Sequence, residues 1–188
     1  GVHATWAAVG GLMADNLEEW RSYSPDLKPT YVQKDFSAYH WVERQQQLYP
    51  ETLFAPELIR EIIQSKGQEF GCHTYSHYYT RENGQQLEQF RADLKSCQRL
   101  ALEKFDMKLE TLVFPRNQYD HESILVASEE GFGTVRSNPE DWFWRHTEKR
   151  SLMKKLFRTG DTLISMGKDS FYPLSSVEPG NYPVLLPT

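Results

Sequence analysis

The residues of this chain best suited to chemistry are His73 and His77, in the segment GCHTYSHYY. Neutral imidazole is the most common protein ligand for zinc, so two imidazoles that face each other supply half of a metal site. A separation of four residues brings two side chains to one side of a helical turn. With 6 histidines in 188 residues, roughly 0.2 such pairs arise by chance, so the spacing alone is a weak signal. Histidines that are merely hydrogen-bonded in a loop are the alternative.

The position of the pair is more informative than its spacing. A helix is predicted to begin at Pro56 and to end before Gly67, and the short apolar run 70–72 then leads directly to His73. This order places both histidines at the carboxyl end of a strand. Open α/β sheets and α/β barrels carry their functional groups at that end. We therefore expect a site rather than a core at His73 and His77.

Two other loops follow predicted strands and should open on the same side of the sheet. The first, FPRNQY, contains Arg116, which could orient a carboxylate, and Tyr119. The second, NPEDW, contains Asp141 and Trp142, which could supply a carboxylate and an apolar wall. Turns with solvated charges are the alternative for both loops.

Arg116 and Asp141 are accordingly the predicted catalytic residues. The predicted substrate contacts are Tyr75, Tyr119 and Trp142.

The elements that must position these loops alternate along the chain. Strands are predicted over 4–9, 70–72, 110–114 and 132–136, and helices over 16–23, 56–66, 82–108, 121–130 and 147–157. Asn16 and Asp120 are the expected N-caps of two of these helices. Alternation of this kind implies a parallel sheet with helical crossovers, so we predict one α/β domain over residues 1–188, a layered structure or partial barrel.

One long segment, residues 24–54, shows no sustained periodicity but is rich in aromatic residues. Loops of this length inside compact domains are uncommon and tend to be functional. We predict an insertion loop that packs over one end of the sheet.

Composition restricts the possible functions. The net charge is −5 and the 21 Lys and Arg residues are scattered, which argues against a nucleic-acid partner. No run approaches the roughly 18 apolar residues of a membrane span. Cys72 and Cys97 are predicted to be buried in a strand and on a helix, which favours a reducing, cytoplasmic location.

Four stretches together resemble the polysaccharide deacetylase (NodB homology) domain, carbohydrate esterase family 4. They are GVHATWAAVG, GCHTYSHYY, LVFPRNQY and GFGTVRSNPEDW, and they span roughly residues 2–142. The histidine segment matches the family's H-[ST]-x-x-H motif. The resemblance implies a distorted (β/α) barrel, a divalent metal ion, usually zinc, held by His73 and His77, and a carbohydrate substrate that loses an N-acetyl or O-acetyl group.

The chain departs from this family pattern in three places. The Thr-Phe-Asp-Asp run that supplies the base and the third metal ligand would lie upstream of Gly1, so we expect a truncated domain whose strand at 4–9 lies at an open edge. The leucine and histidine near the C-terminus that provide the general acid have no match, because His146 comes too early. Finally, Pro115 precedes Arg116, whereas the family has arginine before proline.

Three hypotheses follow. The first is a metal-dependent carbohydrate deacetylase. The second is an incomplete deacetylase-like domain that binds sugar through aromatic residues of the segment 31–49 and Trp142. The third is an α/β interaction domain whose histidines bind nothing.

Overall fold

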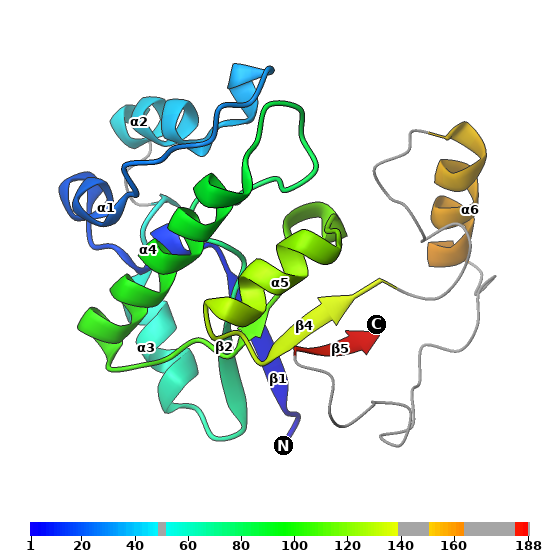
Figure 1. The fold of residues 1–188 in the computed structure, drawn as a ribbon. Helices are drawn as coiled ribbons and strands as arrows, with labels where there is room; N and C mark the ends of the chain where they lie inside the picture. Colours follow the sequence, from blue (N-terminus) through cyan, green and yellow to red (C-terminus); the bar gives the residue numbers. More distant parts are fainter. Residues whose placement is uncertain (49–51, 139–150, 164–182, 188) are drawn as a thin grey trace.

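The computed structural model describes residues 1–48, 52–138, 151–163 and 183–187. Within them the chain forms a parallel sheet in the order β1-β2-β3-β4-β5 (Figure 1). The strands are β1 (Ala4–Ala8), β2 (Gln68–Cys72), β3 (Thr111–Leu112), β4 (Thr134–Ser137) and β5 (Val184–Pro187). The parallel α/β sheet is as predicted. Strand β5 was not predicted, because a short segment ending in proline carries little strand signal.

The helices connect these strands as expected for crossovers. They are α1 (Leu17–Tyr23), α2 (Ala38–Leu48), α3 (Pro56–Gln64), α4 (Leu87–Phe105), α5 (His121–Glu129) and α6 (Leu152–Leu163), with short 3-10 turns η1 (Gly10–Met13), η2 (Lys34–Phe36) and η4 (Pro115–Asn117). Asn16 caps α1 by accepting a hydrogen bond from the Glu19 amide, and Asp120 caps α5 by accepting one from the Ser123 amide. Both N-cap predictions are confirmed.

One face of the sheet carries the core. Alternate residues of β2, β3 and β4 point to this face and are buried, among them Phe70, Cys72, Leu112 and Val135. They pack against the apolar stripe of α4, whose buried members include Phe90, Leu94, Cys97 and Leu100, and against α5. Cys72 and Cys97 are therefore buried free thiols, as predicted, with their sulfur atoms 3.4 Å apart.

The opposite face of the sheet is more polar, and the sheet is open. On this face the carboxylate of Glu69 accepts hydrogen bonds from the hydroxyls of Thr5 and Thr111, which joins β1, β2 and β3. Among the described residues no strand pairs with the outer edge of β1, where the side chain of Trp6 is 52% exposed. The described strands thus form a partial barrel that does not close, and β1 is the edge strand expected.

The predicted insertion loop at 24–54 is not irregular throughout, contrary to what its lack of periodicity had indicated. The segment contains η2 and the 11-residue helix α2. Its apolar side consists mainly of Tyr39 and Val42, both buried, and Tyr39 packs against Trp20 of α1 with ring centroids 5.1 Å apart. Such a short apolar stripe in a polar helix gives too weak a periodic signal, because tertiary packing rather than pattern stabilises the helix.

Helix α6 begins later than the predicted helix at 147–157, and residues 147–150 lie outside the described part of the chain. Of the helices described, none is both long enough and apolar enough to cross a membrane.

Candidate functional site

His73 follows β2 directly and is held from two sides. Its amide donates to the Ala8 carbonyl (2.9 Å), which continues the pairing of β2 with β1. Its ring Nδ1 lies 2.7 Å from the Val113 carbonyl oxygen. Because a carbonyl can only accept, Nδ1 carries the proton, and the lone pair of Nε2 is left for another partner. An outward Nδ1–H bond to a carbonyl is the arrangement found in histidines that ligate metals.

His77 lies beside His73, with ring centroids 4.9 Å apart and planes inclined by 59°. The two rings therefore face each other as predicted, but no helical turn brings them together. The segment between them is irregular, and Thr74 and His77 have positive φ angles of 62° and 57°. A second contact sets the orientation of His77, whose Nδ1 lies 3.0 Å from the Tyr79 hydroxyl.

Backbone strain gathers in the two loops that follow β2 and β3. Five non-glycine residues in the described part of the chain have a positive φ, and four of them lie in these loops: Thr74, His77, Arg116 and Asn117. Left-handed backbone costs a non-glycine residue about 1–3 kcal/mol and persists only where surrounding contacts hold it.

The loop between the histidines is held by backbone contacts on one side. The amides of Gly10 and Gly11 donate to the carbonyls of Thr74 (2.7 Å) and Tyr75 (3.0 Å). Gly10 permits the close approach of the loop, since a Cβ at this position would lie 3.2 Å from the Cα of Tyr75 and 2.4 Å from the sulfur of Cys97 on α4. On the other side, the buried carboxylate of Asp93 on α4 accepts hydrogen bonds from the loop.

Burial determines the protonation state of the pair. Desolvation lowers the pKa of His73 from its usual value of 6.5. The pKa of His77 falls to about 4, mainly through burial and further through the nearby charges of His73 and Arg116. Both imidazoles are therefore neutral at pH 7, which is the form that binds a metal ion.

Arg116 reaches the same region from the turn after β3. Its guanidinium lies over the ring of Tyr79, 3.8 Å from the centroid, and also faces the ring of Phe36 at 4.8 Å. One of its nitrogens pairs with the Glu82 carboxylate at 2.8 Å. The carboxylate that Arg116 orients among the described residues is thus Glu82.

The predicted substrate contacts occupy different environments. Tyr75 is fully buried: its ring stacks on Trp20 and its hydroxyl donates to the Trp20 carbonyl (2.5 Å). Tyr119 packs on Phe114, and its hydroxyl accepts from the Asn138 amide (3.0 Å), which ties the loop after β3 to the end of β4. Asp141 and Trp142 lie outside the described residues.

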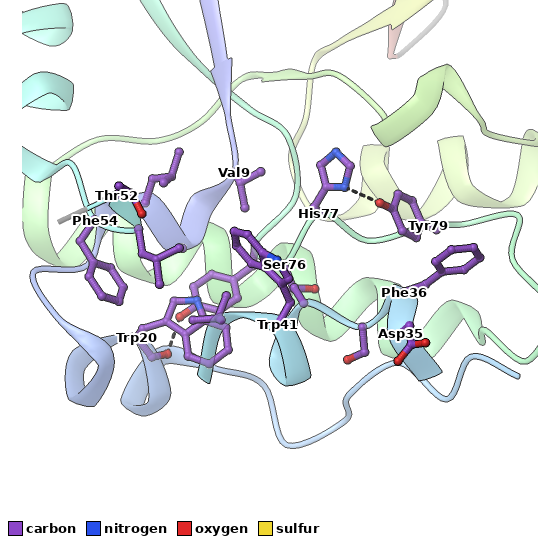
Figure 2. Close-up of a pocket in the computed structure, with 17 residues that line it drawn as sticks. Val9, Trp20, Asp35, Phe36, Trp41, Thr52, Phe54, Ser76, His77 and Tyr79 are labelled. Carbon is purple, nitrogen blue, oxygen red and sulfur yellow. Dashed lines mark hydrogen bonds between the residues drawn. The ribbon is translucent and has the colours of Figure 1, made fainter. Parts of the chain in front are cut away.

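A cavity of about 420 Å³ adjoins His77 (Figure 2). Tyr79, Phe36 and His77 lie at one end of it, and Trp20 and Phe54 at the other, while Trp41 of α2 and Ser76 lie between them. The lining is mostly apolar, with Asp35, Ser37, Thr52, Ser76 and His77 as its polar members, and Tyr75 forms part of the inner wall. Its size is that of a pocket for a small organic molecule.

Sequence reasoning missed Phe36, Trp41 and Tyr79 as individual site residues. For Phe36 and Trp41 the only signal was the aromatic content of residues 31–49, which pointed to the segment but not to the side chains that line the cavity. For Tyr79 the signal was its place two residues after His77.

The imidazoles of His73 and His77 provide part of the ligand set that a metal ion needs. Two neutral imidazoles, one with its Nδ1 bonded to a carbonyl, can ligate zinc at about 2.0–2.1 Å. Within residues 1–48, 52–138, 151–163 and 183–187, no group of three or more His, Cys, Asp or Glu side chains could hold a metal ion. The described residues therefore provide two ligands of such a site.

Comparisons with known proteins point to one family. The family model described as polysaccharide deacetylase matches residues 1–135. A comparison with curated proteins finds no match.

Three solved structures are similar to this chain. IcaB from Ammonifex degensii has 19% identity and a TM-score of 0.40, with 45% of this chain and 40% of that chain covered. The de-N-acetylase from Aggregatibacter actinomycetemcomitans has 15% identity and a TM-score of 0.39, with 47% and 43% covered. BA3943, a CE4 family pseudoenzyme from Bacillus anthracis, has 19% identity and a TM-score of 0.36, with 51% and 30% covered. The chain thus spans less than half the length of each of these structures.

Proposed function

Because the match covers residues 1–135 of 188, the chain belongs to the polysaccharide deacetylase family, and we propose that it removes acetyl groups from a carbohydrate with the help of a divalent metal ion. The observation that carries the proposal is the facing pair His73 and His77, both neutral and 4.9 Å apart between ring centroids. Imidazole suits zinc, copper, iron and nickel, and we propose zinc because it acts as a Lewis acid without redox chemistry.

A bound zinc ion supplies a Lewis acid that polarises the acyl carbonyl and lowers the pKa of a water molecule. His73 would hold such an ion through Nε2, because its Nδ1–H donates to the Val113 carbonyl. His77 presents Nε2 when its Nδ1–H donates to the Tyr79 hydroxyl, which can accept that bond at 3.0 Å. Tyr79 in turn lies under the guanidinium of Arg116, which keeps a positive charge close to the pair.

A metal-dependent hydrolase also needs a group that takes a proton from water and one that protonates the leaving group. Asp141 is proposed as a carboxylate of this cleft. Arg116 is proposed to orient the Glu82 carboxylate, with which it pairs at 2.8 Å.

The cavity beside His77 is the proposed place for part of the substrate. Trp41, which lines the cavity and is 46% exposed, offers a flat apolar surface to a sugar ring, while Asp35 and Ser37 offer acceptors to sugar hydroxyls. Tyr119 and Trp142 are proposed to extend the contact surface beyond the cavity.

The proposal is tested by titrating zinc into the metal-free protein by calorimetry, beside His77→Ala and the control His121→Ala, an exposed histidine at the start of α5. We expect saturable one-to-one binding that is lost in His77→Ala and retained in the control. Acetate release from oligomers of N-acetylglucosamine, with zinc and with EDTA, then tests turnover. Absence of zinc binding in the wild type would refute the proposed metal site.

The second candidate is a carbohydrate-binding domain without turnover. It is favoured by the Arg116–Glu82 ion pair, which occupies the arginine, and by the lack of a third ligand among the described residues. Oligosaccharide binding at the cavity without acetate release under any metal condition would support this candidate over the first.

A further inference from the structure

Asp93 stands out as a carboxylate in an apolar environment. It lies in the middle of α4, next to Leu94 of the core stripe, and its side chain is 1% exposed. An aspartate is almost never buried to this degree unless it has a specific partner, because removal of a carboxylate from water is costly. Neither helix formation nor the packing of α4 requires a charged residue at this position.

Among the described residues, every hydrogen bond that Asp93 accepts comes from the loop between the two histidines. One carboxylate oxygen accepts from the Tyr75 amide at 2.6 Å. The other accepts from the Ser76 amide at 3.2 Å and from the Ser76 hydroxyl at 2.5 Å. The carboxylate thus satisfies two consecutive buried amides that have no strand or helix to pair with.

These two amides lie between the residues whose backbone is left-handed. Thr74 and His77, with φ angles of 62° and 57°, flank Tyr75 and Ser76. Without a partner for the two amides, the loop can relieve the strain and pair its N–H groups in another conformation. Any such change moves His77 relative to His73, because His73 is held separately by the pairing of β2.

We propose that Asp93 is a positioning residue for the metal-binding loop: by binding the amides of Tyr75 and Ser76, it sets the distance and orientation of His77 relative to His73. This inference rests on the proposed metal site at the two histidines. It differs from a purely stabilising role, which would lower the free energy of unfolding and leave the affinity of the folded protein for zinc unchanged.

The test compares Asp93→Asn with a matched control, Leu100→Ala, which removes buried apolar atoms farther along the same helix. In Asp93→Asn one oxygen remains as an acceptor, but the amide NH₂ group faces the Ser76 amide, so one loop contact is lost. We expect the zinc dissociation constant, measured by calorimetry, to rise at least about tenfold. In Leu100→Ala we expect a loss of melting temperature with a zinc affinity within about twofold of wild type.

Hydrogen exchange of the metal-free proteins gives a second readout. The amides of Tyr75 and Ser76 should exchange faster in Asp93→Asn, and those in the middle of α4 should not. If Asp93→Asn does not fold, Ser76→Ala removes only the hydroxyl contact and should weaken zinc binding about threefold.

Three outcomes would overturn the inference while leaving the metal site in place. They are unchanged zinc affinity in the folded variants, equal weakening in Leu100→Ala, or unchanged exchange at Tyr75 and Ser76. Failure of the wild type to bind zinc would overturn both the metal site and this inference.

Discussion

The buried position of His77 predicts a specific dependence of stability on pH. Its pKa is about 4 in the folded protein and 6.5 in an unfolded chain. Between these values the unfolded state binds a proton at this site and the folded state does not. The contribution of His77 to stability is therefore complete above pH 6.5 and is lost as the pH falls toward 4.

The expected size follows from linkage. From pH 7.5 to pH 5.0, a shift from 6.5 to about 4 corresponds to a loss of about 2 kcal/mol in the free energy of unfolding. Since the side chain is partly exposed, screening by solvent reduces this to about 1–2 kcal/mol. Asp93 acts in the opposite direction: burial raises its pKa from 3.8 to about 6, so its contribution to stability increases as the pH falls over the same range.

A comparison of two proteins separates these contributions. Asn tolerates the left-handed backbone at position 77 and places an amide near the position of Nδ1, so His77→Asn is the appropriate variant. Urea unfolding of wild type and variant in EDTA at pH 7.5 and 5.0 gives the difference in their free energies of unfolding at each pH. Because both proteins contain Asp93, its effect cancels in this difference. We expect the stability of the wild type relative to His77→Asn to fall by about 1–2 kcal/mol on acidification. An unchanged difference, or a rise, would refute the conclusion that His77 is desolvated and neutral.

Three further variants test other parts of the structure. Gly84→Ala should lower the free energy of unfolding in urea clearly more than Gly131→Ala, although the φ angles of the two glycines are 90° and 89°. The reason is that only at Gly84 does the new Cβ meet a backbone carbonyl oxygen, at 2.4 Å. Equal losses in the two variants would contradict this prediction. Trp41→Ala should weaken the binding of an N-acetylglucosamine oligomer, measured by calorimetry. Leu27→Ala should not, although Leu27 is 55% exposed and Trp41 is 46% exposed, because only Trp41 lines the cavity. Tyr75→Phe should lower the free energy of unfolding by about 1 kcal/mol and leave oligomer affinity unchanged; a large loss of affinity would instead make the Tyr75 hydroxyl a substrate contact.

Local patterns were sufficient for the features that depend on neighbouring residues in the chain. Apolar runs gave the first four strands to within a few residues, and Asn16 and Asp120 were identifiable as N-caps because a cap acts on the amide three residues later. The same reasoning placed His73 and His77 at the end of a strand, since the apolar run 70–72 directly precedes His73. The two rings were predicted to lie together because of a helical turn. They do lie together, but the helical turn does not form.

The features that decide what the site can do join residues far apart in the sequence, and the sequence by itself did not reveal them. Asp93 meets Ser76 across 17 residues and Arg116 meets Glu82 across 34. A carboxylate on the apolar face of the predicted helix was a visible signal for a buried contact, but nothing local identified its partner.

Helix α2 and the cavity beneath it depended on tertiary structure in the same way, because Tyr39 and Val42 stabilise the helix only when it packs against the rest of the fold. Sequence determined the first four strands in their order along the chain, the N-caps of α1 and α5, and the place of the two histidines. Tertiary structure decided the angle between the imidazoles, their neutral charge and the pocket beside them, since burial and long-range hydrogen bonds exist only once the chain has folded.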